Sequence, residues 1–95
     1  MTFFEIQNQQ LRLCQPLTLE QVPRIWRALL NADLTAVQQL DLSQVDKLDS
    51  SGIAFIIELQ RKIGQPITLF NGPSYLSTLL SLYNLESQIQ FESGV

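Results

Sequence analysis

The chain has 95 residues, of which 45% are hydrophobic and only 16% are charged, and its formal net charge is −3. This length fits one domain over residues 1–95 with a single modest core. The six basic residues are scattered, so no basic stripe is present to follow a phosphate backbone, and nucleic acid is not an expected partner. Because a typical globular domain is roughly 25% charged, we expect a partner to cover part of the surface.

Several classes of function are excluded by residue type. The chain has no histidine and a single cysteine, Cys14, which rules out the usual zinc sites, an internal disulfide and the Ser-His-Asp and Cys-His catalytic arrangements. The glycines form neither a P-loop nor a dinucleotide fingerprint. We therefore expect no enzyme, no catalytic residue, no metal and no cofactor, and we expect Cys14 to be a small buried hydrophobe.

The sequence also predicts where the chain resides. The roughly 18 consecutive apolar residues of a membrane-spanning helix are nowhere present. The first residues lack the charged and apolar regions of a secretory signal. We expect a cytoplasmic protein that does not insert into the membrane.

Two short strands, over 3–6 and 11–14, open the chain and should pair antiparallel, because a polar connection of hairpin length joins them. A helix follows. Thr18 and Gln21 have the spacing of a capping box, but a proline inside a helix is unfavourable, so the helix should begin late, near Pro23, or kink there. Its core face is predicted to consist of Val22, Ile25, Trp26, Leu29 and Leu30.

An apolar strand is expected over 36–42, and helix followed by strand indicates an α/β arrangement. A second helix over 53–63 should end at Gly64, which adopts the left-handed conformation easily. After a short strand over 67–70, the segment beginning at Asn71 offers a capping residue, and Pro73 is suited to the first helical position.

The third helix should run to about Tyr83. Asn84 is suited to the left-handed position that ends a helix, with Leu85 contacting Leu80. A last edge strand is expected over 89–91, and 92–95 should fray.

The turn Asp49-Ser50-Ser51-Gly52 lies directly before the second helix. Either serine could cap the helix, which stabilises it by about 1 kcal/mol. Only one hydroxyl is needed for this, so the other would remain exposed, and Ser50 is a candidate for phosphorylation, which adds a charge of about −1.5 to −2. A helix N-terminus also attracts phosphate, so nucleotide binding is a third possibility.

Three acids lie near this turn. Asp46 and Asp49 could be paired carboxylates, but two acids at a helix start are better explained by the favourable helix dipole. Asp41 lies near the end of a strand, where open α/β sheets place metal or phosphate sites. No second ligand accompanies it in the sequence.

The second helix is apolar over more than one face. Phe55 and Leu59 widen its apolar arc to roughly 200°, about twice what a core-facing stripe needs. These two side chains either pack under neighbouring helices or bind a partner protein, and we favour the partner. The third helix, which ends with Leu82 and Tyr83, also exceeds one stripe, so the two helices together predict a protein-binding surface.

The segments 41–43 and 48–54, Asp-Leu-Ser and Leu-Asp-Ser-Ser-Gly-Ile-Ala, together with Val45, resemble the signature of STAS domains. This fold is shared by bacterial anti-sigma factor antagonists and the cytoplasmic tails of sulfate transporters. The resemblance implies a single STAS domain with a mixed sheet of four to five strands and three or more helices packed mainly on one face. Within the family, Trp26 and the ending Leu82-Tyr83-Asn84-Leu85 are most similar to the small subunit of Mla phospholipid-transport ABC transporters.

This resemblance implies a non-catalytic subunit that binds the ABC ATPase, in complex with a permease and a lipid-binding substrate protein, at the inner membrane. Such a complex maintains the lipid asymmetry of the outer membrane. The alternative is an anti-sigma factor antagonist regulated by phosphorylation of Ser50, which matches the phosphorylated hydroxyl of that group and a partner-contacting threonine of the Mla branch. Trp26 could serve the core or the interface. The predicted partner-binding residues are Trp26, Ser50, Ser51, Gly52, Phe55, Leu59, Leu82 and Tyr83.

Overall fold

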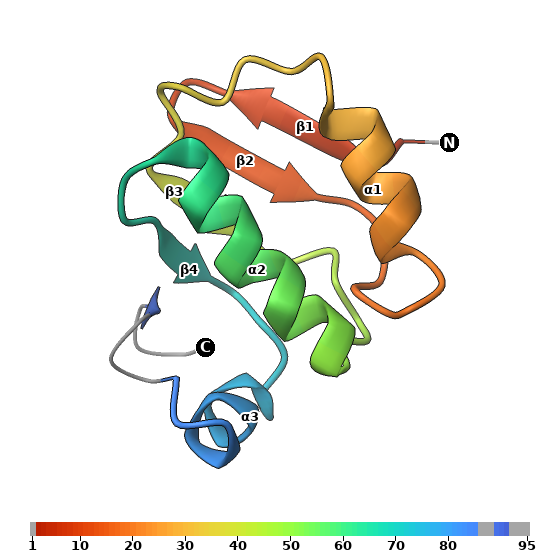
Figure 1. Cartoon of the computed structure of the whole chain (residues 1–95), viewed down its shortest axis with the longest axis vertical. Coiled ribbons are helices and arrows are strands. Elements are labelled where there is room, and N and C mark those ends of the chain that lie inside the picture. The colour runs from red at the N-terminus through yellow and green to blue at the C-terminus, as the bar shows by residue number, and fades with distance from the viewer. Residues whose placement is uncertain (1, 86–88, 92–95) are drawn as a thin grey trace.

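The computed structural model of the chain describes residues 2–85 and 89–91. It is an α/β fold with a five-stranded mixed sheet in the order β1-β2-β3-β4-β5 (Figure 1). The first two strands are antiparallel, and every later pair is parallel. The elements are β1 (Phe4–Gln7), β2 (Gln10–Leu13), α1 (Val22–Leu29), β3 (Gln39–Asp41), α2 (Ser50–Ile63), β4 (Thr68–Phe70), α3 (Leu76–Leu82) and β5 (Gln90–Phe91).

One face of the sheet supports the core. The central strands carry fully buried leucines: Leu11 and Leu13 in β2, Leu40 in β3 and Leu69 in β4. Helices α1 and α2 lie across one face of the sheet (Figure 1). Burial of each such side chain contributes about 1.5–3 kcal/mol. The predicted mixed sheet with helices mainly on one face is therefore confirmed.

The start of α1 follows the sequence expectation in part. The helix begins at Val22, with Pro23 in its first turn, so the late start is confirmed. The capping box that the spacing of Thr18 and Gln21 suggested does not form: Gln21 makes no side-chain cap, and the carbonyl of Thr18 accepts the N–H groups of Gln21 and Val22 instead. Leu30 lies beyond the last helical residue and is 67% exposed, so its assignment to the core face was wrong.

The end of α2 agrees with its sequence signal. Gly64 has a φ of 82°, and its N–H donates to the carbonyl of Gln60 at 3.0 Å. Helix α2 begins at Ser50, three residues before the predicted start at 53. The serines of the turn therefore belong to the first turn of the helix.

Helix α3 begins at Leu76, so the prediction of a start at Pro73 was wrong. Asn71 has a φ of 57°, and its side-chain amide donates to Asp41 at 3.3 Å, so it does not cap the helix. The end is as predicted: Asn84 has a φ of 57°, and the N–H of Leu85 donates to the carbonyl of Leu80 at 2.8 Å.

The edge of the sheet beyond β4 is formed by β5, which pairs parallel to it and confirms the strand expected there. The prediction that 92–95 fray lies outside the described residues. None of the helices in the described part of the chain is long and apolar enough to cross a membrane.

Candidate functional site

Asp49 is the residue that caps α2. One carboxylate oxygen accepts the N–H groups of Ser51 at 2.9 Å and Gly52 at 3.3 Å. The other oxygen accepts the N–H of Leu19 at 3.1 Å, which ties the loop before α1 to the start of α2. The negative charge also lies at the favourable end of the helix dipole. This acid therefore has the structural role expected for it, and the serines do not act as caps.

Both serine hydroxyls of the turn remain available. Neither makes a hydrogen bond to another described residue, and Ser50 is exposed while Ser51 is partly covered. Because the carboxylate of Asp49 already accepts two of the free N–H groups of the first turn, a bound phosphate would compete with a fixed negative charge there. This arrangement weakens the interpretation of the turn as a nucleotide site.

Gly52 is buried and is not a surface contact. A Cβ atom placed there would lie 2.6 Å from the carbonyl oxygen of Leu17 and 2.8 Å from its Cβ. The turn therefore needs glycine for the close approach of α2 to residue 17. The expectation that Gly52 contacts a partner is wrong, because neighbouring backbone covers it.

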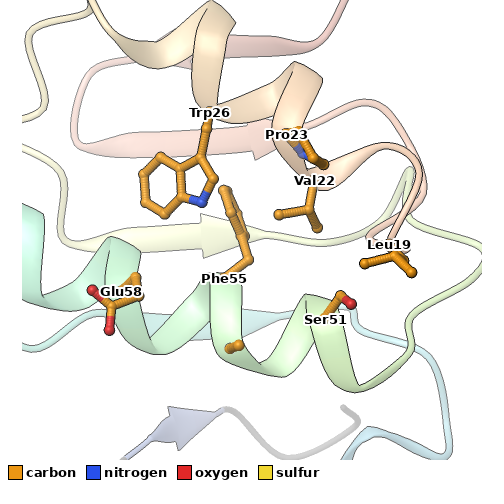
Figure 2. Close-up of a pocket in the computed structure, with 8 residues that line it drawn as sticks. Leu19, Val22, Pro23, Trp26, Ser51, Phe55 and Glu58 are labelled. Atoms are coloured by element: carbon orange, nitrogen blue, oxygen red, sulfur yellow. The ribbon is translucent and has the colours of Figure 1, made fainter.

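A groove lies on the surface between α1 and α2, and we call it the α1–α2 groove. It has a volume of about 240 Å³ (Figure 2). Its α1 side and floor are apolar, and its α2 side carries small or polar side chains. The lining residues on the first side and the floor are Leu19, Val22, Pro23, Trp26 and Phe55. Those on the α2 side are Ser51, Ala54 and Glu58.

A second groove, the α2–α3 groove, has a volume of about 200 Å³ on the other side of α2. It is lined by Ser50, Ile53, Ala54, Ile57, Tyr83 and Leu85. The exposed Ala54 lines both grooves, so it stands on a low ridge between them. We call this ridge and its two grooves the candidate docking face, or docking face for short.

The structure corrects the interpretation of Phe55 and Leu59. Phe55 is 1% exposed and Leu59 is fully buried, so neither presents a free surface to a partner. Their cover comes from within the chain: the ring of Phe55 lies 4.7 Å from that of Trp26, centroid to centroid, at a tilt of 57° (Figure 2). The wide apolar arc of α2 is thus filled by α1, the alternative that the sequence left open.

Trp26 has the packing role considered for it and is also accessible from the surface. It is half-buried against Phe55 and also lines the α1–α2 groove. Leu82 is 71% exposed and Tyr83 is 49% exposed, but only Tyr83 lines a groove. The structure thus brings Trp26, Ser50, Ser51 and Tyr83 to one face, with Phe55 as part of its floor.

Sequence reasoning missed other residues of this face. Ala54 was missed because its side chain is small, and Leu19 because it lies in a loop, where no periodic pattern can be recognised. Leu19 is 73% exposed and lines the α1–α2 groove. A signal for Ala54 does exist. It is the small residue one helical turn after Ser50 and therefore lies on the same side of the helix.

Asp41 does not form the metal or phosphate site considered from the sequence. It is 5% exposed, and its carboxylate accepts the N–H of Ser43 at 2.9 Å, the Arg12 Nε–H at 3.0 Å and the amide of Asn71 at 3.3 Å. Burial raises the pKa of Asp41, but these hydrogen bonds together outweigh it and hold the pKa below its ordinary value. No cluster of three or more potential metal ligands occurs among residues 2–85 and 89–91.

The chain is similar to one known family and to solved structures of the same fold. A family model described as "Mlab, STAS domain" matches residues 4–90. The crystal structure of a Thermotoga maritima protein, TM1081, described as a candidate anti-sigma factor antagonist, has a TM-score of 0.72 at 22% identity, over 93% of this chain and 82% of that one. The NMR structure of TM1081 has a TM-score of 0.67 at 22% identity, over 97% and 81% of the two chains. At this identity the likeness concerns the fold alone. A search of curated proteins returned no match.

Proposed function

The chain belongs to the STAS domain family, and from this premise we propose that it is the small, non-catalytic subunit of an Mla-type ABC transporter. In this role it binds the ATPase subunit on the cytoplasmic side of the inner membrane. The permease and the lipid-binding substrate protein complete the complex, which transports phospholipid and maintains outer-membrane lipid asymmetry.

One observation carries the proposal. The exposed ridge of α2 has an apolar groove on either side, and Ser50 stands at its N-terminal end with an unused hydroxyl. Among the described residues that line these grooves, Glu58 alone is charged. The cores of protein interfaces are likewise poor in charge and rich in aromatic contacts. A neutral, grooved ridge of this kind suits an apolar segment of a protein partner.

Co-purification tests the proposal. The chain would be co-expressed with a tagged ABC ATPase subunit from the same genome, and wild type should be retained on the tag. Ala54→Arg places a long cation on the ridge between the two grooves and should abolish retention. The matched control is Ala36→Arg, at an exposed alanine in the turn before β3. Failure of wild type to co-purify, or full retention of Ala54→Arg, would contradict the proposal.

The second candidate function is that of an anti-sigma factor antagonist. It is supported by the exposed, unbonded hydroxyl of Ser50, which a kinase could reach without unfolding the helix. A phosphoryl group there would stand beside the carboxylate of Asp49 and reverse the neutral character of the face. Stoichiometric phosphate at Ser50 after incubation with a cognate kinase, measured by mass spectrometry, would favour this function. An unmodified Ser50 together with ATPase binding would exclude it.

A further inference from the structure

A third hollow lies away from the docking face, between the start of β1 and the outer side of α1. It has a volume of about 450 Å³ and is lined by Phe3, Arg24, Arg27 and Ala28. It shares no described residue with either groove of the docking face. Figure 1 shows α1 beside β1 at one end of the molecule and α3 at the other.

The two arginines of this hollow form no ion pair with any described residue. The ion pairs among the described residues join Arg12 to Asp41 and Arg61 to Glu58, and Arg24 and Arg27 take part in neither. Both are exposed, and residues three apart lie on the same side of a helix. The sequence of α1, VPRIWRAL, contains no acid to offset them. Two cations on one side of α1 are thus left without an ionic partner in the described part of the chain.

The apolar part of the hollow accompanies these charges. Phe3 is half-buried, and its packing against the hydrophobic core holds its side chain in place. Ala28 is partly covered and leaves room beside the ring. The hollow therefore combines an apolar wall with a cationic rim.

We propose that this hollow binds an acidic segment of a partner protein, with carboxylates on Arg24 and Arg27 and an apolar side chain against Phe3. The planar guanidinium fork matches a carboxylate in two parallel hydrogen bonds, which a single ammonium group does not do. The concave apolar wall adds a contact that a free inorganic anion would not use. The surface is a second docking site, and it stands independently of the function proposed for the α2 ridge.

An anionic membrane fits these residues less well. Basic patches that recognise anionic lipids contain about 4–8 lysines or arginines, whereas Arg24 and Arg27 are the cations lining this hollow in the described part of the chain. A concave site with two cations is better matched by a protruding peptide than by a flat bilayer.

The test is an NMR titration of the ¹⁵N-labelled full chain. The probe is the peptide acetyl-Glu-Asp-Phe-Asp-Glu-Leu-amide, and the control is the same peptide with Gln and Asn in place of Glu and Asp. We expect saturable shifts at the amides of Phe3, Arg24, Arg27 and Ala28, with a dissociation constant of about 1 mM or tighter. The uncharged peptide should produce none, and added salt should weaken binding by the acidic one.

Variants complete the test. Arg24→Gln with Arg27→Gln should weaken peptide binding about tenfold, because two exposed ion pairs are lost. Lys62→Gln removes an exposed cation elsewhere and should leave binding unchanged. Absence of shifts at this hollow, or equal binding by the uncharged peptide or the double variant, would overturn the proposal. Vesicles of phosphatidylcholine and phosphatidylglycerol serve as the other arm: Arg-dependent sedimentation with them, without peptide binding, would also overturn it.

Discussion

The carboxylate of Asp49 accepts the backbone N–H of Ser51 at 2.9 Å, so the acid and not the serine closes the first turn of α2. The turn is therefore held in place by Asp49, and its stability does not depend on either serine hydroxyl. Asp49 stabilises the helix and anchors the loop at Leu19, while the hydroxyls of Ser50 and Ser51 bond to no described residue.

Replacement of Asp49 should therefore affect stability, and replacement of Ser50 should not. Asp49→Ala removes the cap and should lower the free energy of unfolding by about 1–2 kcal/mol. Ser50→Ala removes an exposed hydroxyl with no described partner and should change it by less than about 0.5 kcal/mol. Urea unfolding followed by circular dichroism measures both. A larger cost at Ser50 than at Asp49 would show that the serine is the cap.

Gly52→Ala should be destabilising although alanine is the better helix former by about 1 kcal/mol. The added Cβ would meet the backbone oxygen of Leu17 at 2.6 Å, so α2 would have to move away from residue 17. We expect a loss of about 2 kcal/mol or more in the free energy of unfolding. Gly64→Ala is the matched control: it has open space but a φ of 82°, and should cost only about 1 kcal/mol. Equal or higher stability of Gly52→Ala would contradict the close approach of α2 to residue 17.

The network at Asp41 predicts a pH dependence. Its folded-state pKa lies below the ordinary value, so its contribution to stability is fully present above the unfolded pKa of about 3.9 and is lost as the pH falls through the folded value. Asp41→Asn should lower the free energy of unfolding at neutral pH by about 1–3 kcal/mol. Its stability should also fall less than that of wild type between about pH 5 and pH 2. Parallel acid profiles of the two proteins would show that Asp41 is not the group responsible.

The hydroxyl of Tyr75 accepts the N–H of Leu48 at 2.9 Å and thereby links the start of α3 to the segment before Asp49. Tyr75→Phe leaves that N–H without its acceptor, at a cost of about 1–1.5 kcal/mol. We expect hydrogen exchange at the Leu48 amide to accelerate about tenfold. Tyr83→Phe, at an exposed tyrosine, is the control. Unchanged protection of Leu48 in Tyr75→Phe would mean that the hydrogen bond does not hold this segment.

The ends of the helices show what local sequence can predict. Gly64 and the pair Asn84 and Leu85 end their helices as expected, because the left-handed conformation and its hydrogen bonds involve residues within one turn. The antiparallel start of the sheet is local in the same sense, since β1 and β2 are joined by a turn containing Asn8 at a φ of 58°.

The errors arose where distant residues decide the structure. Asn71 was expected to cap α3, but its side chain bonds to Asp41, thirty positions away. The arc containing Phe55 was correctly identified as wider than one stripe, yet periodicity cannot say whether another helix or a partner covers the excess. Trp26 supplies that cover. The docking face that we propose lies accordingly at the exposed ridge of Ser50 and Ala54 and not at the buried Phe55 and Leu59.

The affinity of the purified chain for the ATPase subunit is the most direct measurement of the central claim, that the α2 ridge is the docking face. It can be measured by isothermal titration calorimetry with wild type, Ala54→Arg and the control Ala36→Arg, each first shown to be folded. We predict tight binding by wild type and Ala36→Arg and a loss of at least about tenfold, or 1.4 kcal/mol, for Ala54→Arg. Equal affinities of all three proteins, or no binding by wild type, would contradict the account.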